Sequence, residues 1–159
     1  MFFLDRLLKI GVQKQNLSKI KPEENPIGIL RFKNVDDTLY RGGKPDYEQL
    51  EKLKELGIDT VVDFTVSYDF ENDKPTEKEL VEKLGMKYIS MPFMSFNNPP
   101  ERYVDNFFKI MQDARDNNKK VFIHCIEGKD RTGLFSAMYK VKYNLSDLPS
   151  SIKEMLAMG

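Results

Sequence analysis

Apolar and polar residues alternate along this 159-residue chain in segments that predict strands and helices in turn. Short apolar runs bounded by turn residues are typical of buried strands, whereas apolar residues three and four positions apart indicate one face of a helix. The expected strands are residues 27–32, 38–41, 60–65, 86–91 and 121–123, and helices are expected after Asp46 and Thr76 and over residues 101–117, 134–139 and 150–158. This alternation predicts an α/β fold, with a central mixed, mostly parallel sheet flanked by helices.

Two of the expected helices carry start and stop signals. Asp46 is suited to cap the first of them, and Gly57 is suited to end it. Thr76 is followed by Glu79 three residues later, which is the pattern of a capping box, and Gly85 ends that helix. These signals support the helical interpretation of both segments.

The beginning of the chain differs in composition from the rest. Residues 1–8 are apolar except for one Asp–Arg pair, and residues 13–25 are polar and rich in Lys. We therefore expect a terminal helix or arm and a linker over residues 1–25, and one folded domain over residues 26–159. The start lacks the basic residues and the cleavage site of a signal peptide. No segment approaches the roughly 20 apolar residues of a spanning helix, so no integral membrane segment is expected.

Charge and cysteine content exclude several functional classes. Lys and Arg number 25 and Asp and Glu also number 25, so no net positive charge attracts nucleic acid. A single Cys cannot form an internal disulfide and suits a reducing compartment, so we expect the cytoplasm. With one His and no second Cys, a zinc site is not expected. Oligomeric state does not follow from these features.

The single His and the single Cys stand together after the apolar run 121–123, and a polar turn and a helix follow. A strand, a tight loop and a helix N-terminus bring backbone N–H groups and the positive end of a helix dipole to one place, which suits an anion. Cys125 and Arg131 put a nucleophile and a bidentate cation around this place. Gly128 permits the crowded backbone, and Thr132 can hydrogen-bond a thiolate. The loop therefore predicts a phosphate site with a nucleophile.

The run from His124 to Gly133 resembles the HCxxGxxRTG signature of the cysteine-dependent protein tyrosine and dual-specificity phosphatases. The stretch Tyr40–Pro45, followed by a helix and a strand ending in Val62-Asp63-Phe64, is similar to the opening of compact bacterial and atypical dual-specificity members. The resemblance covers roughly residues 32–158. It implies a phosphatase fold with a strand–phosphate loop–helix active site.

The resemblance also implies a two-step reaction with no metal or organic cofactor. Cys125 would attack a phosphomonoester and form a cysteinyl-phosphate, which water then hydrolyses. Arg131 and the loop amides would hold the phosphoryl oxygens, while Thr132 supports the leaving thiolate and His124 orients the loop and tunes the cysteine. The residues expected to bind the phosphoryl group are Ile126, Glu127, Gly128, Lys129, Asp130 and Arg131.

The general acid departs from the family pattern. Members usually carry an Asp on a separate loop upstream of the Cys, but residues 91–100 of this chain contain no carboxylate. Asp130 could serve, as in relatives whose loop reads GKDRTG, or Glu101 or an acid of the Asp69–Asp73 segment could move in. The third alternative is a protein with weak activity, or a catalytically inactive phosphate-binding regulatory module.

Substrate class stays open between a phosphotyrosine-type protein and an inositol phosphate or phosphoinositide. Lys129 beside the phosphate site is typical of enzymes that act on inositol phosphates, whereas Glu127 would repel a second anion. Rhodanese-like sulfur transfer is a further alternative, which the position of Thr132 disfavours. Outside the loop, we expect Arg41 and Lys44 to form an ion-paired turn and Asp63 to be structural.

Overall fold

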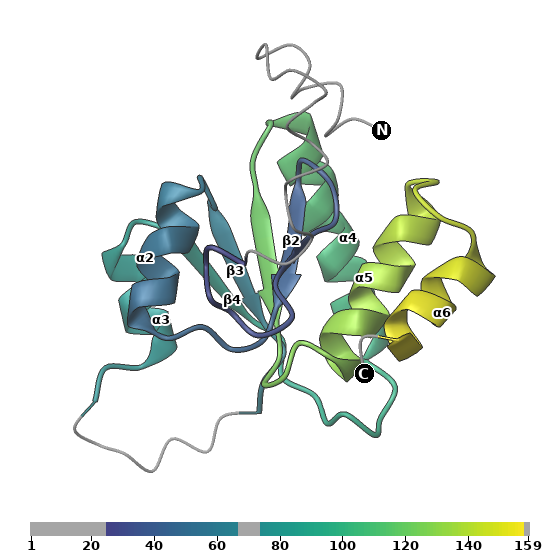
Figure 1. Ribbon diagram of the computed structural model, residues 1–159, viewed down its shortest axis with the longest axis horizontal. Helices are drawn as coiled ribbons and strands as arrows, with labels where there is room; N and C mark the ends of the chain where they lie inside the picture. Colours follow the sequence, from purple (N-terminus) through teal and green to yellow (C-terminus); the bar gives the residue numbers. More distant parts are fainter. Residues whose placement is uncertain (1–24, 67–73, 158–159) are drawn as a thin grey trace.

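The computed structural model describes residues 25–66 and 74–157, which form a five-stranded sheet with helices on both faces (Figure 1). The spatial order is β1-β2-β5-β3-β4. β1 is antiparallel to β2, and the other neighbouring pairs are parallel. The strands are β1 (Lys33–Asn34), β2 (Leu39–Gly42), β3 (Thr60–Asp63), β4 (Lys87–Ser90) and β5 (Val121–His124). The predicted mixed, mostly parallel sheet is confirmed.

The described helices cover both faces of the sheet. They are α2 (Tyr47–Glu55), α3 (Glu77–Lys83), α4 (Glu101–Asp116), α5 (Asp130–Lys142) and α6 (Leu148–Ala157). α2 and α3 lie on one face, and α4 and α5 lie on the other, with α6 packed outside α5 (Figure 1). Glu154 of α6 forms ion pairs with Lys140 of α5 and with Lys33 of β1. No helix within the described ranges is long and apolar enough to cross a membrane.

Two apolar cores lie on opposite sides of the sheet because successive side chains of a strand point to opposite faces. Val61 and Phe122 pack with the side chains of α2 and α3, while Val62 and Ile123 pack with those of α4 and α5. All four side chains are buried. Burial on both faces explains why these strands are continuous apolar runs in the sequence.

The predicted caps of α2 and α3 are confirmed. The Asp46 carboxylate accepts from the backbone N–H of Gln49 at 2.9 Å, and the Gln49 side chain accepts from the N–H of Asp46 at 3.0 Å. Thr76 and Glu79 form the same reciprocal pair at the start of α3. These caps satisfy N–H groups that the first turn of a helix leaves without an internal partner.

The prediction of a strand over residues 27–32 is wrong. Ile27 and Ile29 are buried and alternate with exposed residues, as in a strand, but the backbone folds into turns. Gly28 and Arg31 both have positive φ, 78° and 52°, which extended chain does not allow. The alternation reflects two Ile side chains packed into the α2 core, which a turn achieves as well as a strand.

Other predicted boundaries shift or lie outside the described residues. α5 begins at Asp130, four residues before the expected start at 134, because the last residues of the loop after β5 already form the first helical turn. α6 begins at Leu148. The N-terminal arm predicted over residues 1–25 lies outside the described residues except for Asn25, and residues 67–73 lie outside them too.

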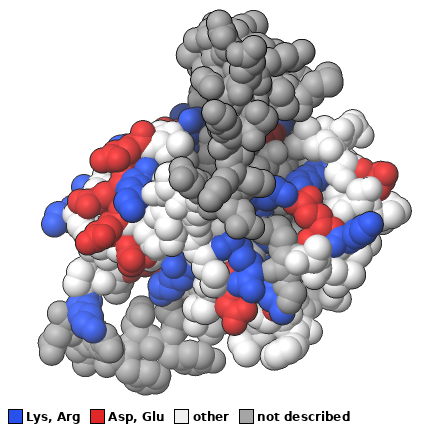
Figure 2. Space-filling view, viewed as in Figure 1, with Lys and Arg blue, Asp and Glu red and all other residues white. Residues whose placement is uncertain are grey.

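β2, β3, β4 and β5 are parallel, so their carboxyl ends lie on the same side of the sheet (Figure 1). Binding sites of open α/β sheets lie at these strand ends. Figure 2 shows the same face of the molecule by charge. Acidic side chains gather over α2 and α3, whereas Lys and Arg side chains lie at the lower centre, around the loop between β5 and α5. An acidic side chain stands among these basic ones, so the loop region carries both charges.

Candidate active site

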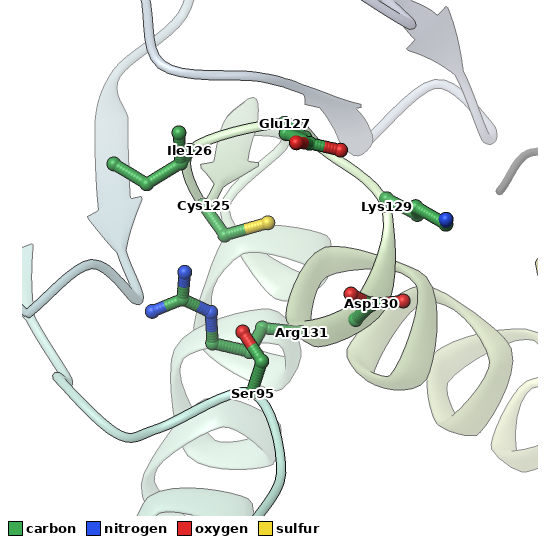
Figure 3. Close-up of a pocket in the computed structure, with 7 residues that line it drawn as sticks. All are labelled: Ser95, Cys125, Ile126, Glu127, Lys129, Asp130 and Arg131. Carbon is green, nitrogen blue, oxygen red and sulfur yellow. The ribbon is translucent and has the colours of Figure 1, made fainter.

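The loop between β5 and α5 encloses the base of a cavity of about 300 Å³. The Cys125 side chain points into the space that this loop surrounds (Figure 3). Its residue is only 3% exposed, so a reacting group must enter the cavity to reach the sulfur. The cavity is lined by Ser95, Cys125, Ile126, Glu127, Lys129, Asp130 and Arg131. The structure thus gathers six of the predicted residues around one volume.

The Cys125 thiol is set up to ionise. Burial by itself raises the pKa of the thiol, but hydrogen bonds from the Thr132 hydroxyl and from the backbone N–H groups of Thr132, Lys129 and Gly128 outweigh it and lower the pKa below its ordinary value. Backbone amides that point at one atom stabilise an anion there. Since the thiolate is the nucleophilic form, this arrangement suits attack on an electrophile at neutral pH.

Thr132 lies beneath the loop rather than in the cavity wall. Its side chain is fully buried, and Oγ1 has no hydrogen-bond partner of normal geometry within the described residues. The same hydroxyl is close enough to Cys125 to lower the pKa of the thiol. A buried hydroxyl without a partner costs free energy, so we expect Oγ1 to donate a hydrogen bond to the sulfur once the thiol ionises.

Arg131 faces the sulfur across the cavity (Figure 3). One terminal nitrogen, Nη1, donates to the backbone oxygens of Phe64 at 2.9 Å and Phe93 at 3.0 Å. These residues follow β3 and β4 closely, so the guanidinium is held by the ends of two strands. The buried Nε has no partner within the described residues. Arg131 is therefore fixed in place and keeps a donor for a ligand.

The turn after β2 supports the loop from below. Arg41 is 2% exposed, and its Nη2 donates to the Gly128 carbonyl at 2.6 Å. The N–H of Lys44 donates to the Ile126 carbonyl at 3.0 Å, and the Lys44 ammonium lies 3.8 Å from Glu77. The ion-paired turn predicted for Arg41 and Lys44 is correct for Lys44, but Arg41 is instead a buried support of the loop backbone.

Gly128 is the tightest point of this packing. Its φ is +68°, and an added Cβ would lie 2.4 Å from the Gly42 backbone carbon and 2.5 Å from the Gly43 nitrogen. We expect Gly128→Ala to lower the free energy of unfolding by more than about 2 kcal/mol, because strain and a backbone clash add. Urea denaturation measures this.

Gly57→Ala provides the matched control. Its φ is also positive, +89°, but an added Cβ would meet nothing closer than 3.8 Å. Only the backbone strain of about 1–2 kcal/mol should therefore appear. Equal losses in the two variants would contradict the close packing of the loop against the β2 turn.

His124 is buried behind the loop and is surrounded by acceptors. Its Nε2 lies 2.6 Å from Glu77 Oε1, and its Nδ1 lies 3.3 Å from the Cys125 carbonyl and 3.8 Å from Asp63 Oδ1. Asp63 accepts from the Thr65 N–H and from the Tyr88 hydroxyl, both at 2.7 Å. The interpretation of Asp63 as structural agrees with these contacts. The sequence did not point to Glu77 or Tyr88 as neighbours of the loop.

The candidate acids are placed differently. Asp130 lines the cavity at the start of α5 (Figure 3). Glu101 is exposed at the first residue of α4 and is not among the residues that line the cavity. The Asp69–Asp73 segment lies outside the described residues. Of the described candidates, Asp130 is therefore the one that lines the cavity with Cys125.

A second cavity of about 240 Å³ adjoins the first. It shares Ser95, Asp130 and Arg131 with the first cavity. Its other lining residues are Phe93, Phe96, Asn97, Asn98, Leu134 and Met155. The Phe96 side chain is 95% exposed at its edge. Ser95 was missed from the sequence because a single Ser in a loop carries no distinguishing pattern.

Comparison with known proteins identifies the family. A model of the family described as "DSP-PTPase phosphatase fused to NAD+ Kinase" matches residues 15–156. The chain belongs to this family. The matched residues include the loop described above, and the α/β fold is also that of solved phosphatase structures.

This DSP-PTPase chain is similar to the dual specificity protein phosphatase TpbA of Pseudomonas aeruginosa (strain UCBPP-PA14), with 27% identity over 125 residues. The match covers 79% of this chain and 53% of TpbA, so the chain spans about half the length of the curated relatives it matches. The crystal structure of P. aeruginosa TpbA has a TM-score of 0.66 and 25% identity, covering 82% of this chain and 76% of that one.

The fold also matches PTPMT1, whose crystal structure in complex with PI(5)P has a TM-score of 0.67. Identity is 17%, and the match covers 79% of this chain and 81% of PTPMT1. At this identity the likeness concerns the fold alone. It agrees with the α/β fold described above.

Proposed function

We propose that this chain is a cysteine-dependent phosphomonoester hydrolase of the protein tyrosine and dual-specificity type. The observation that carries the proposal is the geometry of the loop, which places Cys125 and Arg131 in the lining of one cavity. The hydrogen bonds from Thr132 and from the N–H groups of Lys129 and Gly128, which lower the pKa of the Cys125 thiol, support it. Phosphate, with its negative charge and tetrahedral oxygens, fits a ring of N–H groups beside a guanidinium. Family membership supports the same activity.

In the first step, the Cys125 thiolate attacks the phosphorus of the ester. The sulfur–phosphorus bond forms while the bond from phosphorus to the ester oxygen breaks, and the leaving oxygen takes a proton from Asp130. Charge on the transferring phosphoryl oxygens is stabilised by Nε of Arg131 and by the loop amides. The products of this step are the alcohol and a cysteinyl-phosphate.

In the second step, water attacks the phosphorus and the phosphorus–sulfur bond breaks. The Asp130 carboxylate accepts a proton from the water, and inorganic phosphate leaves. The Thr132 hydroxyl and the N–H groups of Gly128 and Lys129 stabilise the departing thiolate. Each turnover begins from a free Cys125 thiolate, so a reducing compartment such as the cytoplasm suits the reaction.

Among substrates, the site favours a phosphotyrosine-type ester. The second cavity would receive the ester group beyond the phosphate, and Phe96, Leu134 and Met155 give it an apolar wall. Lys129 would assist a second phosphate, but Glu127 lines the same cavity and would oppose it. TpbA has been crystallised with pTyr and PTPMT1 with PI(5)P, so relatives of this fold bind both classes.

A panel of substrates tests the proposal. Phosphate release would be measured on phosphotyrosine peptides, phosphoserine peptides, inositol phosphates and phosphoinositides. NADP would be tested as a further substrate, because the description of the family includes fusion to NAD+ kinase. We expect highest kcat/KM on phosphotyrosine peptides. Phosphate binding without turnover of any ester would instead support an inactive phosphate-binding module.

Replacing Asp130 by Asn tests whether this carboxylate protonates the leaving oxygen of the ester. We expect an alkyl phosphate to lose about 10²–10³ in kcat/KM, which reports only the formation of the cysteinyl-phosphate, because its leaving oxygen must be protonated as it departs. An aryl phosphate such as para-nitrophenyl phosphate should lose less than about tenfold in kcat/KM, because its leaving group is stable as an anion. Steady-state rates on the two esters give the ratio.

Glu127→Gln is the matched control, since it removes an equal charge from the same loop. It should change the aryl and alkyl rates by similar factors. If Asp130→Asn also affects both esters alike, Asp130 is not the acid, and Glu101→Gln would then be measured on the alkyl ester.

A further inference from the structure

The hydrogen bonds around His124 identify which of its nitrogens carry protons. Glu77 faces Nε2 at 2.6 Å and the Cys125 carbonyl faces Nδ1 at 3.3 Å. A carbonyl oxygen can only accept a hydrogen bond, so Nδ1 carries a proton. A carboxylate also only accepts, so Nε2 carries one too. This set of acceptors is the one that an imidazolium needs, and the His124 side chain is fully buried at the end of β5.

Surrounding charges are consistent with a buried cation. Burial lowers the pKa of His124, but the hydrogen bond and charge of Glu77, the charge of Asp63 and the Cys125 carbonyl outweigh this and raise it. Both oxygens of Asp63 already accept hydrogen bonds, one from the Thr65 N–H and one from the Tyr88 hydroxyl. A buried charge of this kind needs a partner of opposite charge.

Glu77 is held as that partner. It is the first residue of α3, where a carboxylate interacts favourably with the helix dipole, and its side chain is only 7% exposed. Oε1 is used by His124, while the buried Oε2 has no hydrogen bond within the described residues, and the Lys44 ammonium lies 3.8 Å away. The main interaction of the Glu77 carboxylate is therefore its hydrogen bond with the His124 imidazole.

Asp63, Glu77 and His124 also bring one donor atom each within 4.8 Å of one another, a spacing that a metal ion could use. In this structure, however, these atoms face one another as proton donor and acceptors. Both Asp63 oxygens and both ring nitrogens already have hydrogen-bonding neighbours. We therefore interpret the cluster as a proton-holding network.

We propose that Glu77 is a positioning residue for the nucleophile: it keeps His124 protonated on both nitrogens, and this cation holds the Cys125 backbone and favours the thiolate. The inference rests on the proposed role of Cys125 as the nucleophile. Other cations also lie near the sulfur: Lys129 and Arg131 line the cavity, and Arg41 interacts with the charge of Cys125. Arg41 donates to the Gly128 carbonyl and Lys44 pairs with Glu77, so the side-chain partner of the imidazole at hydrogen-bond distance is Glu77. Glu77 therefore links α3 to the reactivity of the loop.

Because the chain has a single His, NMR of protein labelled with ¹⁵N-His reads this ring alone. We expect both ring nitrogens of the wild type to be protonated at pH 7, because its surroundings raise the pKa of His124 above the ordinary value. In Glu77→Gln the ring should lose one proton by about pH 7, near the ordinary pKa of histidine. A wild-type ring with one unprotonated nitrogen at pH 7 would overturn the proposal, whether or not the variant folds.

The rate of Cys125 alkylation by iodoacetamide as a function of pH gives the second readout. We expect Glu77→Gln to move the midpoint upward by about one pH unit, because the thiolate then loses the nearby positive charge of His124. Glu79→Gln is the matched control, because it also removes a charge from the first turn of α3, but Glu79 is exposed and its carboxylate accepts hydrogen bonds from Thr76. Its midpoint should not move.

An unchanged midpoint in folded Glu77→Gln would overturn the proposal. Neither measurement needs substrate turnover, so both remain informative if the phosphatase proposal fails. A shift of similar size in Glu79→Gln would assign the effect to the helix N-terminus and would equally count against Glu77.

Discussion

Cys125→Ser is expected to abolish phosphomonoester hydrolysis. The serine hydroxyl is nearly isosteric with the thiol, but the loop that lowers the pKa of a thiol cannot ionise an alcohol at neutral pH. Without a nucleophile no covalent intermediate forms, and loss of a catalytic nucleophile typically costs about 10⁴–10⁶ in kcat. Hydrolysis of para-nitrophenyl phosphate at pH 6–7 measures the loss.

The same variant should still bind inorganic phosphate, because the loop amides and Arg131 are unchanged. Phosphate binding by isothermal titration, together with an unchanged thermal midpoint, would show that the variant is folded and that chemistry alone is lost. If Cys125→Ser kept more than a few per cent of wild-type kcat, another nucleophile would have to act and the proposed reaction would be wrong.

Arg131→Lys is expected to produce the second-largest loss, about 10²–10³ in kcat, the usual effect of removing a donor from the transition state. Lysine keeps the positive charge but not the fork. It cannot both donate to the Phe64 and Phe93 carbonyls and present a second nitrogen to the phosphoryl group. Initial rates on phosphotyrosine peptide and on para-nitrophenyl phosphate check the loss.

Arg115→Lys serves as the control for this substitution. Arg115 on α4 pairs with Asp36 and Tyr139 and does not line the catalytic cavity. Its replacement should leave kcat within about twofold, while costing less than about 1 kcal/mol of stability, as for other partly exposed ion pairs. An Arg131→Lys enzyme within tenfold of wild type would show that charge alone, and not the fork, acts at this position.

The sequence was sufficient where one local pattern had one structural solution. Val121–Ile123, followed by His124 and Cys125, was expected to be a buried strand that ends in a loop, and the structure has β5 there. The helix after the loop was also expected, although α5 begins four residues earlier than predicted. The caps at Asp46 and Thr76 were equally local, since cap and N–H lie within one turn. Cys125, Arg131 and the loop between them followed from spacing within seven residues.

The sequence was misleading where a periodic pattern had more than one solution. Ile27 and Ile29 alternate with exposed residues as strand residues do, yet the positive φ of Gly28 and Arg31 folds that segment into turns. Hydrophobic periodicity reports which side chains are buried, whereas the backbone conformation depends on the α2 surface against which they pack. No local signal distinguished the two.

By itself, the sequence determined the alternating α/β architecture and the identity of the loop that carries the nucleophile and the guanidinium. The tertiary structure alone decided what surrounds that loop: Arg41 beneath Gly128, Ser95 across the cavity, and Glu77 against His124. These residues come from 30 to 87 positions away in the chain. Such neighbours are set by the meeting of strand ends at one edge of the sheet, and no periodicity or spacing in the sequence encodes them.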